Sequence, residues 1–262
     1  MVSGKASREA RREKIAEARL RVARQEATRK AVRVGSLVIV LVVAVMAGLV
    51  FWQEHDSGQE AAAATTATPA NLGLDNSVVD GDDSAAVKVV IYEDFQCADC
   101  AAFESATRDQ LADWVKDGDV QVQYRPVALL DDKSTDDYST RALNALGAVV
   151  NADADAALEF QQLLLDNQPD EGGAGLTDDQ LVDYAVQAGA DEDIVRTAVE
   201  GRTYQDWTAQ VTQDASTADV TTTPTVLVNG TALDDVTKKA LKSAVTDALA
   251  VAAATDTTVS EK

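Results

Sequence analysis

Cys97 and Cys100 are the only two cysteines of the chain, and they form a single Cys-x-x-Cys motif. The apolar, β-branched run 86–92 before them predicts a buried strand. After them, apolar residues recur at steps of three and four, which predicts an amphipathic helix. Cys97 is therefore expected at the helix N-terminus, where free N–H groups and the helix dipole stabilise a thiolate. Because the thiolate is the reactive form of cysteine, this placement indicates redox chemistry.

Two alternative roles for the cysteine pair stay open from the residues alone. A structural disulfide across so short a loop would stabilise the fold by only about 2 kcal/mol. A zinc site usually needs four Cys or His ligands when structural and three when catalytic. The chain offers two cysteines and one histidine, His55, which lies in a polar segment. We therefore predict no metal site, and the same shortage of histidine argues against Ser-His or Cys-His hydrolase mechanisms.

Charge is divided unevenly along the 262 residues. Residues 1–34 carry eleven Lys and Arg against four Asp and Glu, a net charge of +7, whereas the remainder carries −28. A body this acidic repels the phosphates of nucleic acids, so binding of DNA or RNA by it is excluded. Solubility outside the cell accounts for the charge, and a preference for basic client proteins is the alternative.

Residues 34–52 contain no charged side chain and consist mainly of Val, Leu, Ile and Ala. At about 1.5 Å per residue this segment matches the hydrocarbon thickness of a bilayer, so we predict one transmembrane helix. The basic segment 1–33 precedes it, and the positive-inside rule places that segment in the cytoplasm and the acidic body outside. Segment 1–33 either only orients the helix or also lies on anionic headgroups. A signal peptide cleaved near 61–64 is the alternative to a retained anchor.

A linker, a folded domain and a tail make up the rest of the chain. Residues 53–85 are predicted to be a linker, which is flexible over 53–70 and contains a first edge strand near 77–79. The folded domain is expected to span 86–254, followed by a C-terminal tail over 255–262. Within the domain, a helical insertion at 135–218 is expected to pack as a lid over one edge of a sheet.

Strand signals flank this insertion on both sides. The run 120–125 alternates apolar and polar residues, and with the first strand and its helix it predicts a right-handed βαβ unit. After the insertion, Thr-Pro-Thr at 223–225 leads to Asn-Gly at 229–230 between two short apolar runs, which is the signal of a tight hairpin. A helix over 235–254 is expected to close the domain.

The order of these elements resembles the DsbA-like branch of the thioredoxin superfamily. The resemblance covers roughly residues 86–254 and depends on five short motifs: Asp-Phe-Gln-Cys at 94–97, Asn-Gln-Pro at 167–169, Gly-Leu-Thr-Asp-Asp at 175–179, Thr-Pro-Thr at 223–225 and Val-Asn-Gly at 228–230. It implies an α/β fold class. This is a thioredoxin fold with a helical insertion between the second core strand and the cis-proline strand, preceded here by the transmembrane helix.

The resemblance also implies an activity and a role for four residues. Cys97 is implied to be the exposed nucleophile that forms a mixed disulfide, and Cys100 the buried thiol that resolves it. Thr223 is implied to precede a cis proline, Pro224, in a loop that lies beside the cysteines and binds extended substrate backbone. The implied activity is thiol–disulfide exchange on exported proteins with thiols or disulfides, with a membrane or extracytoplasmic redox partner and no cofactor.

The dipeptide between the cysteines departs from the family pattern. It is Ala98-Asp99, whereas strongly oxidising relatives carry Pro-His or a similar pair. The negative charge of Asp99 opposes a nearby thiolate, so it should raise the pKa of Cys97 relative to a histidine at that place. A less stable thiolate means a less oxidising couple, so we predict a reduction potential toward the reducing end of the known range, which runs from about −120 to −270 mV.

A second departure concerns the buried acid that relays protons to the resolving thiol. Many relatives place a carboxylate six residues before the nucleophile, and here that position is Ile91. Glu93 and Asp94 lie nearby and are candidates to replace it. The alternative is that both are ordinary solvated acids of a helix-entry loop, and slow resolution of the mixed disulfide would follow.

Three functions are compatible with these expectations. The first is a membrane-tethered oxidoreductase that forms, reduces or isomerises disulfides in exported proteins; isomerisation is disfavoured because no dimerisation segment stands out. The second is a non-catalytic binding or chaperone module whose cysteines are locked in a structural disulfide. The third is a dedicated reductant of one partner, such as a cytochrome-maturation or sulfoxide-repair protein. The reducibility of Cys97 separates the first from the second, and the breadth of the client list separates the first from the third.

Overall fold

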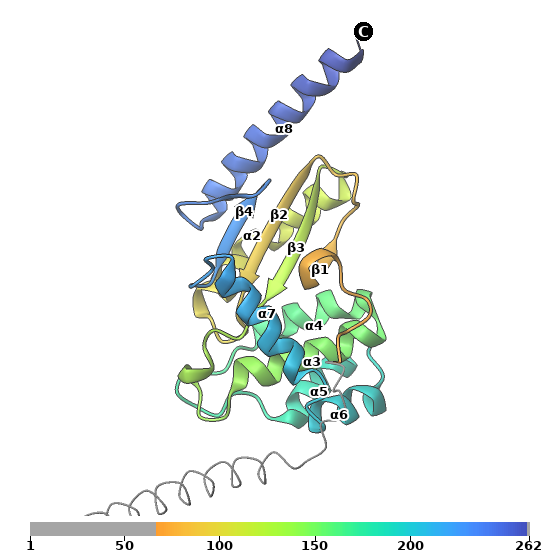
Figure 1. The fold of residues 1–262 in the computed structure, drawn as a ribbon, viewed down its shortest axis with the longest axis vertical. Helices are drawn as coiled ribbons and strands as arrows, with labels where there is room; N and C mark the ends of the chain where they lie inside the picture. Colours follow the sequence, from red (N-terminus) through yellow and green to blue (C-terminus); the bar gives the residue numbers. More distant parts are fainter. Residues whose placement is uncertain (1–66, 261–262) are drawn as a thin grey trace, which may run out of the picture. The chain divides into compact units, whose positions relative to one another are not determined.

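The computed structural model describes the backbone of residues 67–260 and the side chains as far as residue 255 (Figure 1). The predicted basic segment, the predicted transmembrane helix and most of the predicted linker lie outside these residues, as does the alternative cleavage site. Within the described range, no helix combines the length and the apolar character that crossing a membrane requires.

Five strands form one mixed sheet in the order β1-β3-β2-β4-β5. The central strands β2 (Val87–Glu93) and β3 (Val120–Pro126) are parallel. β1 (Val78–Asp80) pairs antiparallel with β3, which confirms the predicted edge strand at a position one residue later. β4 (Thr225–Val228) pairs antiparallel with β2, and β5 (Thr231–Ala232) pairs antiparallel with β4 at the edge of the sheet.

The connection between β2 and β3 and the hairpin between β4 and β5 both agree with the sequence patterns. α2 (Ala98–Lys116) joins β2 to β3, so the predicted βαβ unit is present. The hairpin between β4 and β5 turns at Asn229 and Gly230, whose φ angles are 47° and 81°. Two consecutive positive φ angles are what a two-residue hairpin turn needs, and Asn-Gly is the pair that adopts them most readily.

The last helix, α8 (Lys238–Ser260), differs from its expected bounds at both ends. It begins later because Thr237 caps it: the Thr237 Oγ1 accepts a hydrogen bond from the Ala240 N–H at 3.3 Å. It continues into the predicted tail because Ala-rich sequence without Gly or Pro favours further helical turns. The C-terminal end of α8 projects beyond the sheet (Figure 1).

Five helices make up the insertion between β3 and β4: α3 (Tyr138–Ala152), α4 (Ala154–Asp166), α5 (Asp178–Gln187), α6 (Glu192–Glu200) and α7 (Gln205–Thr217). α3 is buried along most of its length and contacts the other four. α4 contacts both α2 and the edge strand β1, so this part of the insertion lies at a sheet edge, as predicted.

α7 does not follow the prediction of a lid at the sheet edge. It runs in front of the strands in Figure 1, and Ala215 of this helix packs with Tyr92 and Val127. Side chains alternate across a strand, so Val90 and Tyr92 face away from α2 and leave an apolar surface on the other side of the sheet. The C-terminal part of α7 packs on part of that surface, so the insertion contacts a face of the sheet as well as an edge.

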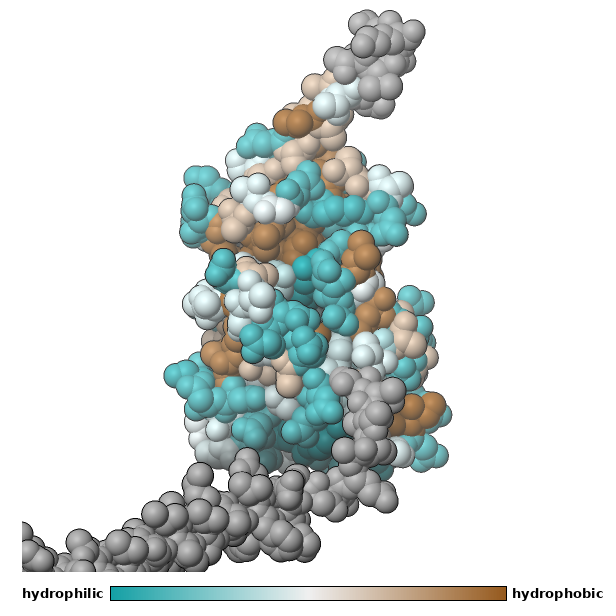
Figure 2. Space-filling model, in the orientation of Figure 1, coloured by the Kyte–Doolittle hydropathy of each residue, from teal (hydrophilic) through white to brown (hydrophobic). Residues whose placement is uncertain are grey.

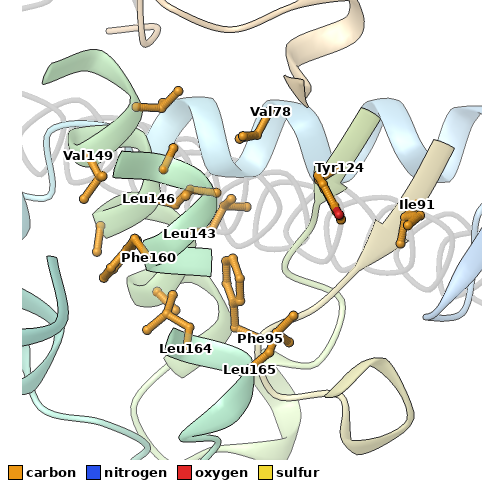
Figure 3. Packing of buried hydrophobic residues seen from close by; sticks show 14 of the residues in the cluster. Val78, Ile91, Phe95, Tyr124, Leu143, Leu146, Val149, Phe160, Leu164 and Leu165 are labelled. Carbon is orange, nitrogen blue, oxygen red and sulfur yellow. The ribbon is translucent and has the colours of Figure 1, made fainter. Parts of the chain in front are cut away.

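One buried apolar cluster joins the sheet to the insertion (Figure 3). Ile91 and Tyr124 come from the strands, Leu143 comes from α3, and Phe160 comes from α4. Phe95, in the loop before Cys97, lies in the same cluster and is fully buried. The loop that carries the nucleophile is therefore anchored in the core. Outside the core, hydrophilic residues cover much of the face seen in Figure 2, in keeping with the net charge of −21.

Candidate active site

Cys97 is the residue that caps the N-terminus of α2. Its backbone is extended (φ −79°, ψ 109°), and its Sγ accepts a hydrogen bond from the Cys100 N–H at 3.2 Å. Both cysteines are unpaired thiols in this structure. The N-cap position is where the orphan N–H groups of a helix point, so the predicted placement of Cys97 at the helix N-terminus is confirmed.

The two thiols have opposite acidities. The pKa of Cys97 is lowered to about 7, chiefly by a hydrogen bond from the Cys100 side chain. Hydrogen bonds with Thr223 and the Cys100 backbone lower it further, whereas burial and the charge of Asp94 raise it. The pKa of Cys100 is raised far above its usual range, chiefly by burial and by its interaction with Cys97. At neutral pH a large fraction of Cys97 is therefore thiolate, whereas Cys100 keeps its proton.

Cys97 is less accessible than the resemblance implies. Only 5 % of its surface is exposed, against 2 % for Cys100. The loop at Thr223 covers it: the Cys97 thiol donates to the Thr223 carbonyl oxygen at 3.3 Å. The expectation of an exposed nucleophile is thus corrected to a mostly covered one. Hydrogen bonds lower the pKa of Cys97, whereas burial is the main cause of the raised pKa of Cys100.

The Thr223-Pro224 peptide bond is cis, and its loop lies beside the cysteines. Together with α2 and the start of α8, this loop lines a groove of about 510 Å³. The groove contains Phe103 on the α2 side and Val236 before α8, with Asp99 and Lys238 as charged residues. An apolar groove with few charges, next to a reactive thiol, is suited to an extended peptide segment.

Ala98 and Asp99 are both exposed on the first turn of α2. The carboxylate that raises the pKa of Cys97 in this structure is that of Asp94. Because Asp99 is exposed, the effect that we predict for its charge on the pKa of Cys97 acts through solvent, where water and salt weaken it.

Glu93 is a buried acid, not a solvated one. It is the last residue of β2, lies on the same side of the sheet as Ile91, and is 1 % exposed. Its Oε1 has no hydrogen-bond partner among the described residues. Burial raises the pKa of Glu93 well above its usual range, and the charges of Glu104 and Cys97 raise it further. The negative charge of Glu93 in turn contributes to the raised pKa of Cys100.

Asp94 ties the active-site loop to the insertion. Its Oδ1 accepts from the Gln96 N–H at 2.9 Å and from the Ser139 hydroxyl at 2.6 Å, and its Oδ2 accepts from the Leu130 N–H at 3.0 Å. Burial raises its pKa to about 6, while these hydrogen bonds oppose the increase. Asp94 is thus fully engaged with protein groups, which leaves Glu93 as the buried carboxyl with an unpaired oxygen.

Sequence reasoning missed two sets of residues near the site. Glu104 and Arg108 form an ion pair on α2, and Arg108 also binds Asp166 of α4 at 2.7 Å. The spacing of four between Glu104 and Arg108 is a readable signal for such a pair. Gln168 donates from Nε2 to the carbonyl oxygen of Cys97 at 2.9 Å, and nothing but its place in the Asn-Gln-Pro motif marked it.

Comparison with known proteins agrees with this geometry. The thioredoxin family model matches residues 74–247, which is more than half of the chain. No match was found among curated protein sequences. Among solved structures, the reduced DsbG of Mycobacterium tuberculosis, described as a disulfide bond oxidoreductase, is 28 % identical with a TM-score of 0.59, covering 71 % of this chain and 96 % of that one.

Two further structures are similar over nearly their whole length. Reduced DsbA of M. tuberculosis is 27 % identical, with a TM-score of 0.57 and coverage of 68 % of this chain and 98 % of that one. BdbD of Bacillus subtilis is 22 % identical, with a TM-score of 0.61 and coverage of 71 % and 99 %, and shows the shared fold. The chain therefore belongs to the thioredoxin family, in its DsbA-like branch of thiol–disulfide oxidoreductases.

Proposed function

We propose that the chain exchanges disulfides with exported proteins through Cys97 and Cys100. When the reduced enzyme acts, the Cys97 thiolate attacks one sulfur of a client disulfide and forms a mixed disulfide, and the other client sulfur leaves as a thiolate. Cys100 then gives up its proton and attacks the Cys97 sulfur. The client leaves with both cysteines reduced, and the enzyme keeps a Cys97–Cys100 disulfide. The reverse sequence oxidises a client.

The observation that carries this proposal is the unequal acidity of two thiols three residues apart. The pKa of Cys97 is lowered to about 7, so it serves as an attacking group near neutral pH, whereas burial keeps Cys100 protonated until a mixed disulfide exists. A purely structural pair needs no such difference. The groove beside Pro224 supplies a place for the client segment.

We assign to Glu93 the role of accepting the proton that Cys100 gives up when it attacks the mixed disulfide. Its carboxyl is buried, carries an unpaired oxygen and interacts electrostatically with both cysteines. Because burial raises the pKa of Glu93, its carboxylate binds a proton more strongly than a solvated carboxylate does, which suits it to accept the proton of Cys100. Glu93 thus takes the role that Ile91 cannot fill, from a place two residues closer to the nucleophile.

The acidity of Cys97 also bears on the direction of electron flow. Its pKa of about 7 is close to that of thioredoxin, about 7, and far from that of DsbA, about 3.5. A more stable thiolate makes a more oxidising couple, so we propose a potential nearer to that of thioredoxin, about −270 mV, than to that of DsbA, about −120 mV.

The test is a redox titration of the purified full-length chain in detergent, against dithiothreitol or glutathione buffers, with alkylation of Cys97 as the readout. A potential near that of thioredoxin supports the proposal and favours a reductase or a dedicated reductant. A potential above about −200 mV overturns the assignment of direction and favours an oxidase. If Cys97 resists both reduction and alkylation, the catalytic proposal fails and a binding module takes its place.

We further propose that residues 34–52 anchor the protein in the cell membrane as a single span, with the N-terminus in the cytoplasm and the catalytic domain outside. Three sequence features support this: the span has no charge, the segment before it has a net positive charge, and the body is acidic. Because the chain has only two cysteines, a membrane-impermeant maleimide added to intact cells under reducing conditions should label Cys97. Labelling only after lysis contradicts the proposed topology, and recovery in the alkaline-carbonate supernatant contradicts the anchor.

A further inference from the structure

We infer that Gln168 is a positioning residue for Cys97, through which the helical insertion sets the reactivity of the nucleophile. The inference rests on the proposed function and adds to it a residue from outside the βαβ core. Gln168 follows α4, and its Nε2 donates to the Cys97 carbonyl oxygen at 2.9 Å across 71 positions of sequence. In the part of the chain that the structure describes, no other side chain of the insertion has a hydrogen bond to either cysteine.

The Cys97 carbonyl is a sensitive point because it is the first acceptor of α2. It also accepts from the Cys100 N–H at 3.0 Å and the Ala101 N–H at 3.2 Å. A third donor from outside the helix holds this peptide plane in place. The plane determines how the Cys97 Sγ meets the Cys100 N–H, at 3.2 Å, and the Thr223 carbonyl, at 3.3 Å. Those contacts have little tolerance, since a hydrogen bond weakens steeply with misalignment.

Gln168 can act in this way because its own position is fixed. The end of α4 is closed by Asn167, whose backbone N–H and side-chain Nδ2 both donate to the Leu163 carbonyl, at 3.1 and 2.8 Å. Asp166, the last residue of α4, forms an ion pair with Arg108 of α2 at 2.7 Å. α4 is therefore attached to the same helix that Cys97 caps. The donor and the carbonyl that it contacts therefore belong to parts of the fold that are held together independently.

The charge distribution supports the same role. The amide of Gln168 places the positive end of its dipole at the Cys97 carbonyl, next to the developing thiolate. Without it, the carbonyl would present more uncompensated negative charge to the sulfur, and the orienting contact would be lost as well. The uncompensated carbonyl and a weaker hydrogen bond from the Cys100 N–H to the Cys97 Sγ would both raise the pKa of Cys97. Neither effect requires a contact between Gln168 and the reacting sulfur.

Two substitutions separate donation from packing. Gln168→Ala removes the side chain, and Gln168→Met keeps its length but has neither a hydrogen-bond donor nor a charge. Gln187→Ala is the matched control, since Gln187 is an exposed glutamine at the end of α5. For each full-length protein in detergent we would measure the pH dependence of Cys97 alkylation, thiolate absorbance and the rate of mixed-disulfide formation with a model disulfide.

We expect Gln168→Ala and Gln168→Met both to raise the pKa of Cys97 and to slow alkylation at about pH 6 by about two- to tenfold, the effect of one lost hydrogen bond. The control should match the wild type. If Gln168→Met behaves like the wild type, or if neither variant shifts the pH profile, the inference is overturned. If the wild type itself performs no exchange, the proposed function fails, whereas the alkylation profiles still decide the role of Gln168.

Discussion

The βαβ core and the helical insertion contribute to the site in different ways. The core supplies every group that we expect to react: the sulfurs of Cys97 and Cys100 and the carboxyl of Glu93. The insertion supplies none of these, but it donates to the loop twice, from Ser139 to Asp94 and from Gln168 to Cys97. The reacting atoms and the hydrogen bonds that adjust them therefore come from separate regions of the fold. Variants of the core should therefore abolish or block a step of the exchange reaction, whereas variants of the insertion should change the pKa of a group in the active-site loop.

The largest expected effect comes from the core cysteines themselves. Cys97→Ser should abolish disulfide exchange, because Cys100 is 2 % exposed and remains protonated. Cys100→Ser should instead stop the reaction at the mixed disulfide. Acid quenching followed by non-reducing electrophoresis separates the two outcomes. Mixed disulfides formed by Cys97→Ser protein would contradict the assignment of the nucleophile.

Glu93→Gln should slow the second step and spare the first. The glutamine keeps the shape but cannot accept the Cys100 proton, and loss of a general base usually costs about a hundredfold to ten-thousandfold in rate. The mixed disulfide should therefore accumulate in rapid-quench experiments. Glu159→Gln, at an exposed site on α4, is the control. Equal resolution rates in the Glu93 variant and the wild type would assign the proton transfer to another group.

Asp94 should make stability depend on pH. Burial raises its pKa to about 6 from an ordinary value of 3.8, so between these values the folded protein holds a proton that the unfolded chain has released. Its contribution is therefore fully present below about pH 4 and is lost as the pH rises through about 6, a decrease of about 3 kcal/mol in the free energy of unfolding. Urea titrations from about pH 4 to 7 should show the wild type losing this amount relative to Asp94→Asn.

Ser139→Ala tests the contribution of the insertion directly, because Ser139 belongs to α3 and its hydrogen bond lowers the pKa of Asp94. Without the hydroxyl, the pH window over which stability falls should extend upward. A difference between wild type and Asp94→Asn that stays constant with pH would show that the buried carboxyl does not titrate in this window.

Asp99→Asn should have the smallest effect. Removal of an exposed negative charge near the cysteines should lower the pKa of Cys97 and speed alkylation below neutral pH by about two- to threefold, and added salt should weaken the difference. Asp113→Asn, at an exposed position near the other end of α2, is the control. A slower rate for Asp99→Asn would reverse the sign of our prediction about the dipeptide.

Local patterns predicted most of the core. The Cys-x-x-Cys position, the βαβ unit, the Asn-Gly turn and the placement of the Thr223-Pro224 loop all agree with the structure, because each depends on neighbouring residues or on the family resemblance. The position of α7 on a sheet face, the covering of Cys97 and the contacts of Ser139 and Gln168 were not predicted. They join residues tens of positions apart, and neither periodicity nor turn chemistry carries that information.

The apolar cluster that holds the sheet and the insertion together contains both cysteines as free thiols. The packing of this cluster thus contains no covalent cross-link, and a bridge across so short a loop would add little to its stability. With two cysteines, the chain has only one internal pairing available, so it cannot become trapped in a scrambled isomer of itself.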